Sequence, residues 1–155
     1  MDSTAAIKTG PTYYSQTFRH EVDRKRRVSI PAKWRPEEPI EFTLMVWLKS
    51  PEGPCLRVLP PDQMATLMRD LVTMPNDDPS KTILKRLIGS QSAQVTVDKV
   101  GRICIPDEFA REAGITDKAV LVGCLDKFEI WNPERYERVK AADNVMAAEA
   151  FKRME

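Results

Sequence analysis

The sequence predicts an α+β fold built from two related halves. A ten-residue phrase occurs twice, 75 positions apart, at Val22–Pro31 and at Val97–Pro106. Each copy is followed by a short helical pattern, two apolar strand patterns and a longer helical pattern. Repeats of this kind are typical of supersecondary units that bury their apolar faces against each other. We therefore expect a pseudo-symmetric pair in which any functional site is made twice.

Length and composition narrow the class of protein. The 155 residues suffice for one domain or for two very small ones with a shared core, and 42% of them are apolar. The chain lacks an apolar run of about 18 residues and a signal-peptide pattern, so we expect a cytoplasmic protein without a membrane partner. Three scattered cysteines and the single His20 offer little for a disulfide scaffold, a metal site or a nucleophilic pair. We expect no metal, no cofactor and no small-molecule substrate.

The first half follows a polar, flexible extension predicted at residues 1–13. Residues 15–22 are loosely extended, and residues 27–30 alternate polar and apolar as a half-buried strand does. Pro31 ends this strand and can open a helical turn. Two apolar runs, Phe42–Leu48 and Cys55–Leu59, then predict buried strands. We place the first unit at residues 14–63.

A helical connector is predicted at residues 64–91. Its first helix starts around Pro61 and its second at Pro79, with Asp78 as N-cap and Gly89 as C-cap. Helical spacing gives each helix one apolar stripe, which we expect to be core. The two stripes are Met64, Leu67, Met68, Leu71 and Val72, and Ile83, Leu84, Leu87 and Ile88.

The second half repeats this plan over residues 92–136 and continues into a C-terminal helix at residues 137–155. Strand patterns cover residues 93–97, 102–105, 119–122 and 127–131, and a short helix pattern covers residues 106–114. Asn132-Pro133-Glu134 corresponds to Pro60-Pro61-Asp62 and begins the last helix.

The repeated phrase predicts a hairpin with a three-residue loop. In Asp98-Lys-Val-Gly-Arg102, Gly101 occupies the position that needs a left-handed conformation. Asp98 can accept hydrogen bonds from the following amides, and Arg102 can pair with it across the hairpin. The same holds for Asp23 and Arg27. This purely structural account of the two aspartates has about the same weight as a functional one.

The arginines and lysines favour a functional interpretation. The net charge is only +1, but seven basic residues lie between Arg19 and Arg35 against two acidic ones. Such a run by itself fits a solvated turn equally well. On projecting hairpin tips, however, guanidinium groups suit phosphate oxygens and the guanine edge, and a two-stranded ribbon can enter a major groove. The candidate DNA contacts are Arg24, Lys25, Arg26, Arg27, Lys99 and Arg102.

Three phrases carry a family resemblance: VDRKRRVSIPAKWR, VDKVGRICIPDEFAREAG and LVGCLDKFEIWNPERYE. Together with the LKRLIGSQSAQ segment, they resemble the MraZ family from about residue 14 to residue 139. Two Asp-x-x-x-Arg motifs, Asp23/Arg27 and Asp98/Arg102, match the family signature. The resemblance implies an AbrB-like swapped-hairpin (double-split) β-barrel formed by the two halves, with peripheral helices. It also implies a nucleoid-associated regulator that binds promoter direct repeats in double-stranded DNA, upstream of the cell-division and cell-wall genes, as a ring-like homo-oligomer.

Two features depart from the family pattern. Arg26 stands where the family usually has glycine, and a left-handed conformation costs a non-glycine residue about 1–2 kcal/mol. The first turn is therefore either shaped differently or gains a phosphate contact. The chain also carries about a dozen extra N-terminal residues. Both departures bear on which operator is recognised.

Two other classes remain as alternatives. Antitoxins that bind DNA and a toxin share the swapped-hairpin fold, but they usually have one copy and a disordered tail. The sequence gives little support for an enzyme on a related barrel, because it shows no Gly-rich phosphate loop, metal-ligand spacing or histidine pair.

Overall fold

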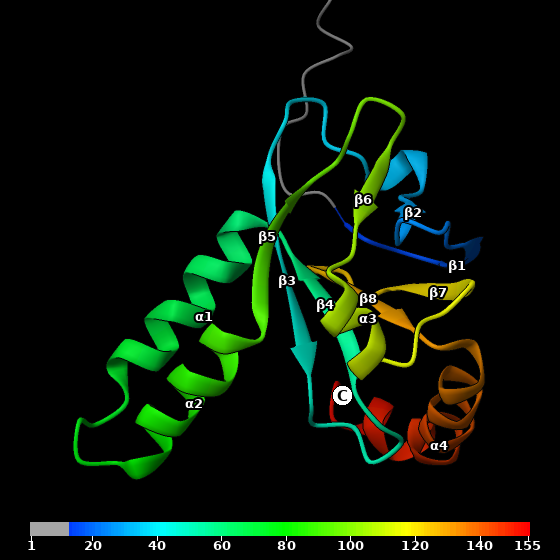
Figure 1. Ribbon diagram of the computed structural model, residues 1–155. Coiled ribbons are helices and arrows are strands. Elements are labelled where there is room, and N and C mark those ends of the chain that lie inside the picture. The colour runs from blue at the N-terminus through cyan, green and yellow to red at the C-terminus, as the bar shows by residue number, and fades with distance from the viewer. Residues whose placement is uncertain (1–12) are drawn as a thin grey trace, which may run out of the picture.

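The computed structural model describes residues 13–155, so residues 1–12 of the predicted extension lie outside the described part. Within that part the chain is α+β, as predicted from the sequence (Figure 1). The strands are β1 (Thr17–Glu21), β2 (Arg27–Ser29), β3 (Glu41–Trp47), β4 (Cys55–Leu59), β5 (Ser92–Thr96), β6 (Arg102–Cys104), β7 (Lys118–Gly123) and β8 (Phe128–Trp131). The helices are η2 (Ala32–Trp34, 3-10), α1 (Pro61–Thr73), α2 (Pro79–Ser90), α3 (Asp107–Glu112) and α4 (Pro133–Lys152).

The sheet pairing interleaves the two halves. Six strands form an antiparallel sheet in the order β1-β7-β8-β4-β3-β5, so the first strand of each half pairs with the other half. The remaining strands, β2 and β6, pair with each other. Among the described residues no ladder joins β1 to β5, and the sheet is therefore not closed into the predicted barrel. The second strand of each hairpin is only three residues long and leaves the sheet to pair with its counterpart.

The main core lies between the six-stranded sheet and the β2/β6 pair. Val28 and Ile103, opposite each other in that pair, are each 1% exposed and point inward. An aromatic cluster of Tyr14, Trp34 and Phe128 fills the centre, with ring centroids 5.0–5.9 Å apart. The indole of Trp34 also donates to the carbonyl of Ser15. Burial of this face fixes the position of both hairpins.

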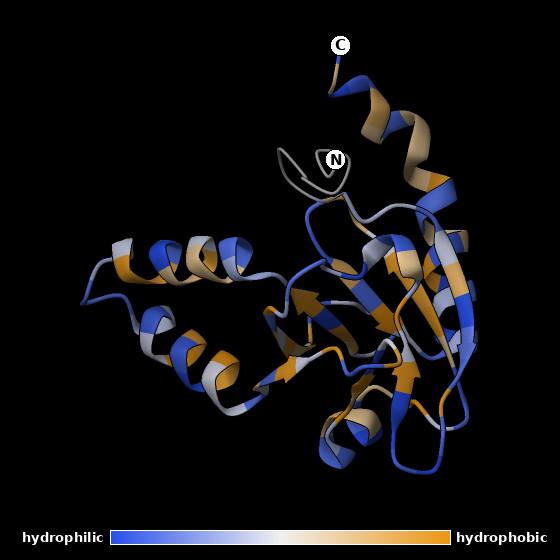
Figure 2. Cartoon of the chain, turned by 90° about the horizontal axis from the view of Figure 1, so that it is seen from above, coloured by the Kyte–Doolittle hydropathy of each residue, from blue (hydrophilic) through white to orange (hydrophobic). Residues whose placement is uncertain are grey.

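Helices α1 and α2 form a hairpin that projects from the body, which we call the helical arm (Figures 1 and 2). The expectation that both apolar stripes are core is wrong: no residue of α1 is buried, and Met68, Val72, Ile83 and Leu87 are exposed. The arm projects from the sheet, and none of its apolar side chains belongs to the core cluster. Apolar side chains on this arm are thus left open to solvent.

Local signals account for the ends of the arm. Asp78 caps α2 by accepting from the amide of Ser80, as expected, whereas Gly89 lies inside α2, which ends at Ser90. Lys81 is buried and closes the inter-helix turn. Its ammonium donates to the carbonyls of Val72 and Met74 and to the Asn76 side chain, at 2.6–3.1 Å.

Helix α4 begins at an Asn132 cap, which accepts from the amide of Arg135. Its first turns pack on the second face of the sheet, where Tyr136 and Val139 contact a small cluster around Trp131. Its last turns extend beyond the body (Figure 2). No helix among residues 13–155 is both long and apolar enough to cross a membrane.

Candidate nucleic-acid interface

The first Asp-x-x-x-Arg motif forms a tight turn, which we call the first tip (residues 23–27). One oxygen of Asp23 accepts from the amides of Lys25 and Arg27, both at 2.9 Å. Its other oxygen accepts from Nε of Arg27 at 2.7 Å. Arg26 takes the left-handed conformation, with φ +62°. The aspartate therefore holds both the turn and the arginine that follows it.

The second tip (residues 98–102) has the same construction. Asp98 accepts from the amides of Val100 and Arg102 at 3.0 and 2.9 Å, and from Nε of Arg102 at 3.2 Å. Gly101 has φ +87°, as the loop pattern predicted. Backbone hydrogen bonds from Asp98 to Arg102 and from Gly101 to Asp98 close the loop. Both aspartates thus accept hydrogen bonds from their own turns and from the arginine that follows.

Strands β2 and β6 join the two tips into one antiparallel ribbon. Two crossed hydrogen bonds extend it: the amide of Ile30 donates to Gly101, and that of Ile105 donates to Arg26, both at 2.8 Å. Since Gly101 and Ile105 are four residues apart, the tips lie about 13 Å from each other at roughly 3.3 Å per residue. The two copies of the motif therefore form one continuous surface.

The outward face of the ribbon is polar. Arg27 and Ser29 on β2 alternate with buried Val28, while Arg102 and the exposed Cys104 on β6 alternate with buried Ile103. Nη1 of Arg102 lies 4.0 Å from Asp23, so this carboxylate faces both motif arginines. About one third of each arginine side chain is exposed. Both guanidinium groups are thus oriented yet open to solvent on one side.

Ionised aspartates hold these arginines. The amide of Arg27 hydrogen-bonds Asp23 and lowers the pKa of that carboxyl, and the Arg27 side chain adds to the effect. The amide of Arg102 lowers the pKa of Asp98 in the same way. Hydrogen bonds to the charged form favour it, so both carboxylates remain charged at neutral pH.

Arg26, which corresponds to Gly101 of the second tip, contacts α3 and the segment that follows it. Its guanidinium donates to the carbonyl of Ile115 at 3.3 Å, and its Nε lies 3.5 Å from Asp107. At the second tip, Arg35 donates to the carbonyl of Ile30 at 2.7 Å and lies over Gly101, where a Cβ atom would collide with it. Positions 26 and 101 correspond in the repeat, as do Arg35 and Ala110. Each tip is thus contacted by one such arginine, and both come from the first half: Arg26 from the first turn itself, and Arg35 from the end of η2.

The remaining candidates lie at the two ends of the ribbon. Arg24, Lys25 and Lys99 are exposed, and Arg26 is half-buried against α3. Arg35 and Cys104 also belong to this region, although the sequence analysis did not select them. The sequence did contain a signal for Arg35. Where the second copy has Gly101 in place of Arg26, the first copy has Arg35 in place of Ala110, so an arginine is lost at one pair of equivalent positions and gained at the other.

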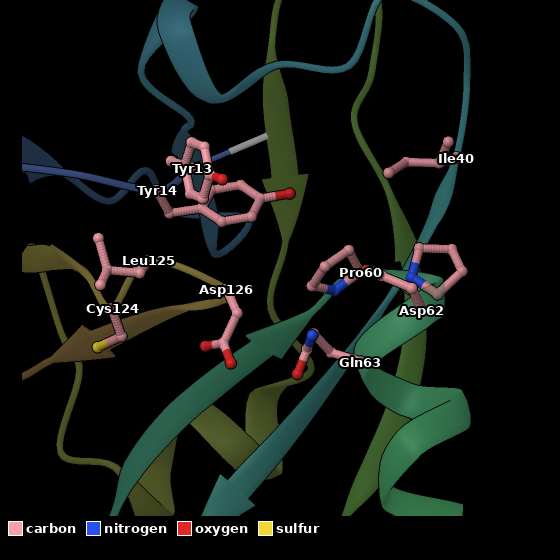
Figure 3. Close-up of a pocket in the computed structure, with 10 residues that line it drawn as sticks. Tyr13, Tyr14, Ile40, Pro60, Asp62, Gln63, Cys124, Leu125 and Asp126 are labelled. Atoms are coloured by element: carbon pink, nitrogen blue, oxygen red, sulfur yellow. The ribbon is translucent and has the colours of Figure 1, made fainter. Parts of the chain in front are cut away.

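A separate hollow of about 730 Å³ lies between the start of α1 and the loop before β8 (Figure 3). Tyr14, Ile40 and Leu125 contribute apolar surface, and the carboxylates Asp62 and Asp126 line it as well. The described residues that line it include no lysine or arginine, so its charge opposes phosphate binding. Residues 13–155 also contain no group of three or more potential metal ligands.

Comparison with known proteins identifies the family. The chain is 33% identical to the transcriptional regulator MraZ of Lachnoclostridium phytofermentans, over 77% of this chain and 82% of that protein. The chain belongs to the MraZ family. The MraZ protein of Rhodospirillum rubrum is also 33% identical, over 78% of this chain and 80% of its own length. The family model described as "MraZ protein, putative antitoxin-like" matches residues 89–154.

The MraZ likeness spans both motifs. The transcriptional regulator MraZ of Caulobacter vibrioides is 29% identical over 138 residues, which cover 89% of this chain and 88% of that protein. A match of this length in a chain of 155 residues contains both tips and the ribbon between them. The family prediction made from the repeated phrases is therefore confirmed.

Proposed function

We propose that this chain is a sequence-specific, DNA-binding transcriptional regulator that contacts duplex DNA with the β2/β6 ribbon and its two tips. One observation carries the proposal: strands β2 and β6 bring both Asp-x-x-x-Arg motifs into one antiparallel ribbon, and the outer face of this ribbon carries the two motif arginines. A B-DNA major groove is about 12 Å wide and admits a two-stranded ribbon. The names of the MraZ relatives support the same class. On this proposal the chain is a binding protein and not an enzyme.

The ribbon residues divide by role. Arg27 and Arg102 stand at its centre with their Nε atoms held by aspartates, which leaves the terminal nitrogens to reach guanine N7 and O6. Arg24, Lys25 and Lys99 lie at the ends, where they can reach phosphates on either side of the groove. Arg26 adds its charge from a side chain held against α3. Asp23, Asp98 and Gly101 shape the turns.

The targets on this proposal are short direct repeats upstream of the cell-division and cell-wall gene cluster that includes the gene of this protein. The protein would act in the cytoplasm, on the nucleoid. A footprint of the purified chain on the DNA upstream of its own gene tests this directly. We expect protected repeats of constant spacing, and uniform or absent protection would contradict the proposal.

A salt titration tests the role of the tips. Each phosphate contact by Lys or Arg contributes about −0.9 to the slope of log K against log salt. Replacing Arg24, Lys25 and Arg26 by Ala should therefore flatten the slope by up to about 2.7. The control replaces Lys140 and Lys152 of α4 and the following Arg153 by Ala, which removes equal charge away from the ribbon. Equal slopes for the two variants would place the DNA surface elsewhere.

Base readout has a separate test. Arg27→Ala and Arg102→Ala should each lose about 1–3 kcal/mol of preference for the protected repeat over random DNA. Total affinity for random DNA should fall less. If a variant is unfolded by circular dichroism, that arginine serves the turn, and the assignment of base readout is wrong.

We also propose that the functional species is a ring-like homo-oligomer. Direct repeats require copies placed head to tail, and such heterologous contacts close into rings when the rotation permits. The exposed apolar residues of the helical arm, Met68, Val72, Ile83 and Leu87, support a contact with another copy. Light scattering and binding to duplexes with one or several repeats test this proposal. A monomer with equal per-site affinity on both duplexes would contradict it.

An antitoxin-type role is the second candidate, because the matching family model is described as antitoxin-like. On this alternative, a toxin would cover exposed side chains such as Val145, Met146, Phe151 and Met154 near the end of α4. Purification from the native cell distinguishes the two functions. A toxic protein bound in equal amount, whose activity the chain abolishes, would favour the antitoxin role.

A further inference from the structure

Besides Arg26 and Gly101, a second pair of equivalent positions gives the two tips of the ribbon different chemistry. Lys25 and Val100 are 75 residues apart and occupy the same place in the repeat. Each donates its amide to the aspartate two residues earlier, at 2.9 Å from Lys25 to Asp23 and at 3.0 Å from Val100 to Asp98. The backbone geometry is thus the same, and only the side chains differ. One tip presents an ammonium group there, and the other presents an isopropyl group.

Val100 is an exposed apolar residue that does not pack against the core. Its side chain is 60% accessible to solvent, at the end of a hairpin whose Val97 and Ile103 pack against the core. The turn around it is held by Asp98 on one side and by Arg35 over Gly101 on the other. A rigid turn with an apolar group at its end is suited to a specific apolar contact.

We infer that Val100 is a specificity-determining residue that contacts the C5 methyl group of thymine in the major groove. This inference rests on the DNA-binding function proposed above. The thymine methyl is the apolar group among the polar atoms that base edges present in that groove. The neighbouring Lys99 is exposed and can hold the tip to a phosphate, which keeps Val100 close to the bases.

The difference between the tips also gives the ribbon a direction. A ribbon with identical ends, related by a pseudo-two-fold axis, binds a site equally well in either of two orientations. Here one end carries Arg24 and Lys25, and the other carries Lys99 and Val100. Thymine contact at one end only therefore selects one orientation, which direct repeats require of every bound copy.

The test removes the methyl group from the DNA. Each thymine of a protected repeat is replaced in turn by deoxyuridine, and binding of the full chain is measured at constant salt. We expect one or two positions per repeat at which affinity falls about fourfold, the fold-change that corresponds to loss of one buried methyl-sized group. Val100→Ala should lose this sensitivity to uracil and bind the thymine duplex about as weakly as the unaltered chain binds the uracil duplex.

Two variants serve as controls. Val145→Ala changes the same residue type at an 81% exposed position on α4 and should keep the full sensitivity to uracil. Lys25→Ala should flatten the salt dependence at the first tip and leave the uracil effect unchanged. Because Val100 is exposed, its alanine variant should melt at the temperature of the unaltered chain.

The outcomes separate this inference from the proposed function. If the chain binds no specific DNA, the proposed function fails and the inference fails with it. If the chain protects its repeats but no uracil position matters, the inference alone is overturned. It is also overturned if Val100→Ala keeps the uracil sensitivity of the unaltered chain.

Discussion

Gly101 is the position at which a single methyl group should most clearly disturb the ribbon. It has φ +87°, and a Cβ atom there would collide with the guanidinium of Arg35. An alanine in the left-handed region costs about 1–2 kcal/mol. Displacement of Arg35 also breaks its hydrogen bond to the Ile30 carbonyl, which is worth about 1 kcal/mol. We therefore expect Gly101→Ala to lower the free energy of unfolding by about 2–3 kcal/mol.

Urea titration and thermal melting at one fixed protein concentration measure this loss. For a chain of this size the expected change in melting temperature is roughly 4–12 °C. Gly89→Ala is the matched control, because Gly89 lies inside α2 with no neighbour within 4 Å of the added Cβ. That variant should gain roughly 0.5–1 kcal/mol of stability from helix propensity.

A double-mutant cycle separates the collision from the backbone term. Arg35→Ala leaves room for the new Cβ, so the double variant should be more stable than the sum of the single changes predicts, by about 1 kcal/mol. Strict additivity would show that Arg35 and position 101 do not interact. A Gly101→Ala variant as stable as the unaltered chain would refute the whole account of the second tip.

Three further predictions concern other groups. Because the pKa of Asp98 is lowered in the folded chain, this carboxylate stabilises the fold above the ordinary aspartate pKa near 4, and the stabilisation is lost as the pH falls through the pKa of the folded state. Between pH 5 and pH 3, the urea midpoint of Asp98→Asn should therefore fall less than that of the unaltered chain. Iodoacetamide at pH 7.5 should modify the exposed Cys104 first, because burial raises the pKa of the Cys124 thiol to about 11 and raises the pKa of the Cys55 thiol further. Mass spectrometry locates the adduct, and modification of Cys104 should also weaken DNA binding. Lys81→Met should destabilise the chain by about 1–3 kcal/mol in urea titration, because the carbonyls of Val72 and Met74 lose their shared donor, and amide hydrogen exchange should accelerate at the end of α1.

Local chemistry made the turns predictable. Asp98 and Arg102 are four residues apart, and the three-residue loop between them leaves few conformations once Gly101 is left-handed. The same reasoning placed the Asp78 cap, whose side chain accepts from the amide of Ser80, and the start of the last helix at Asn132. Such contacts depend on neighbouring positions, so a single sequence contains the information. Because the phrase is repeated, a turn predicted in one half could also be predicted in the other.

Pairing between distant strands could not be read in this way. The short strands β2 and β6 are 75 residues apart, and their three-residue patterns do not specify a partner. The family resemblance implied a swapped-hairpin, double-split β-barrel, whereas the described six-stranded sheet is open, with β1 and β5 at its edges. The apolar stripes of the helical arm correctly predicted helices but wrongly predicted core, because spacing shows that a face is apolar and not what covers it.

The sequence by itself determined the α+β class, the two-fold repeat, both Asp-x-x-x-Arg turns and the family to which they belong, because each depends on residues close together in the chain. Only the tertiary structure decided that the two motifs share one ribbon, that Arg35 lies over Gly101 while Arg26 turns toward α3, and that the helical arm stands apart from the core. These features depend on which segments pack together over long distances. That choice is made by the summed burial of both halves, and no local pattern records it.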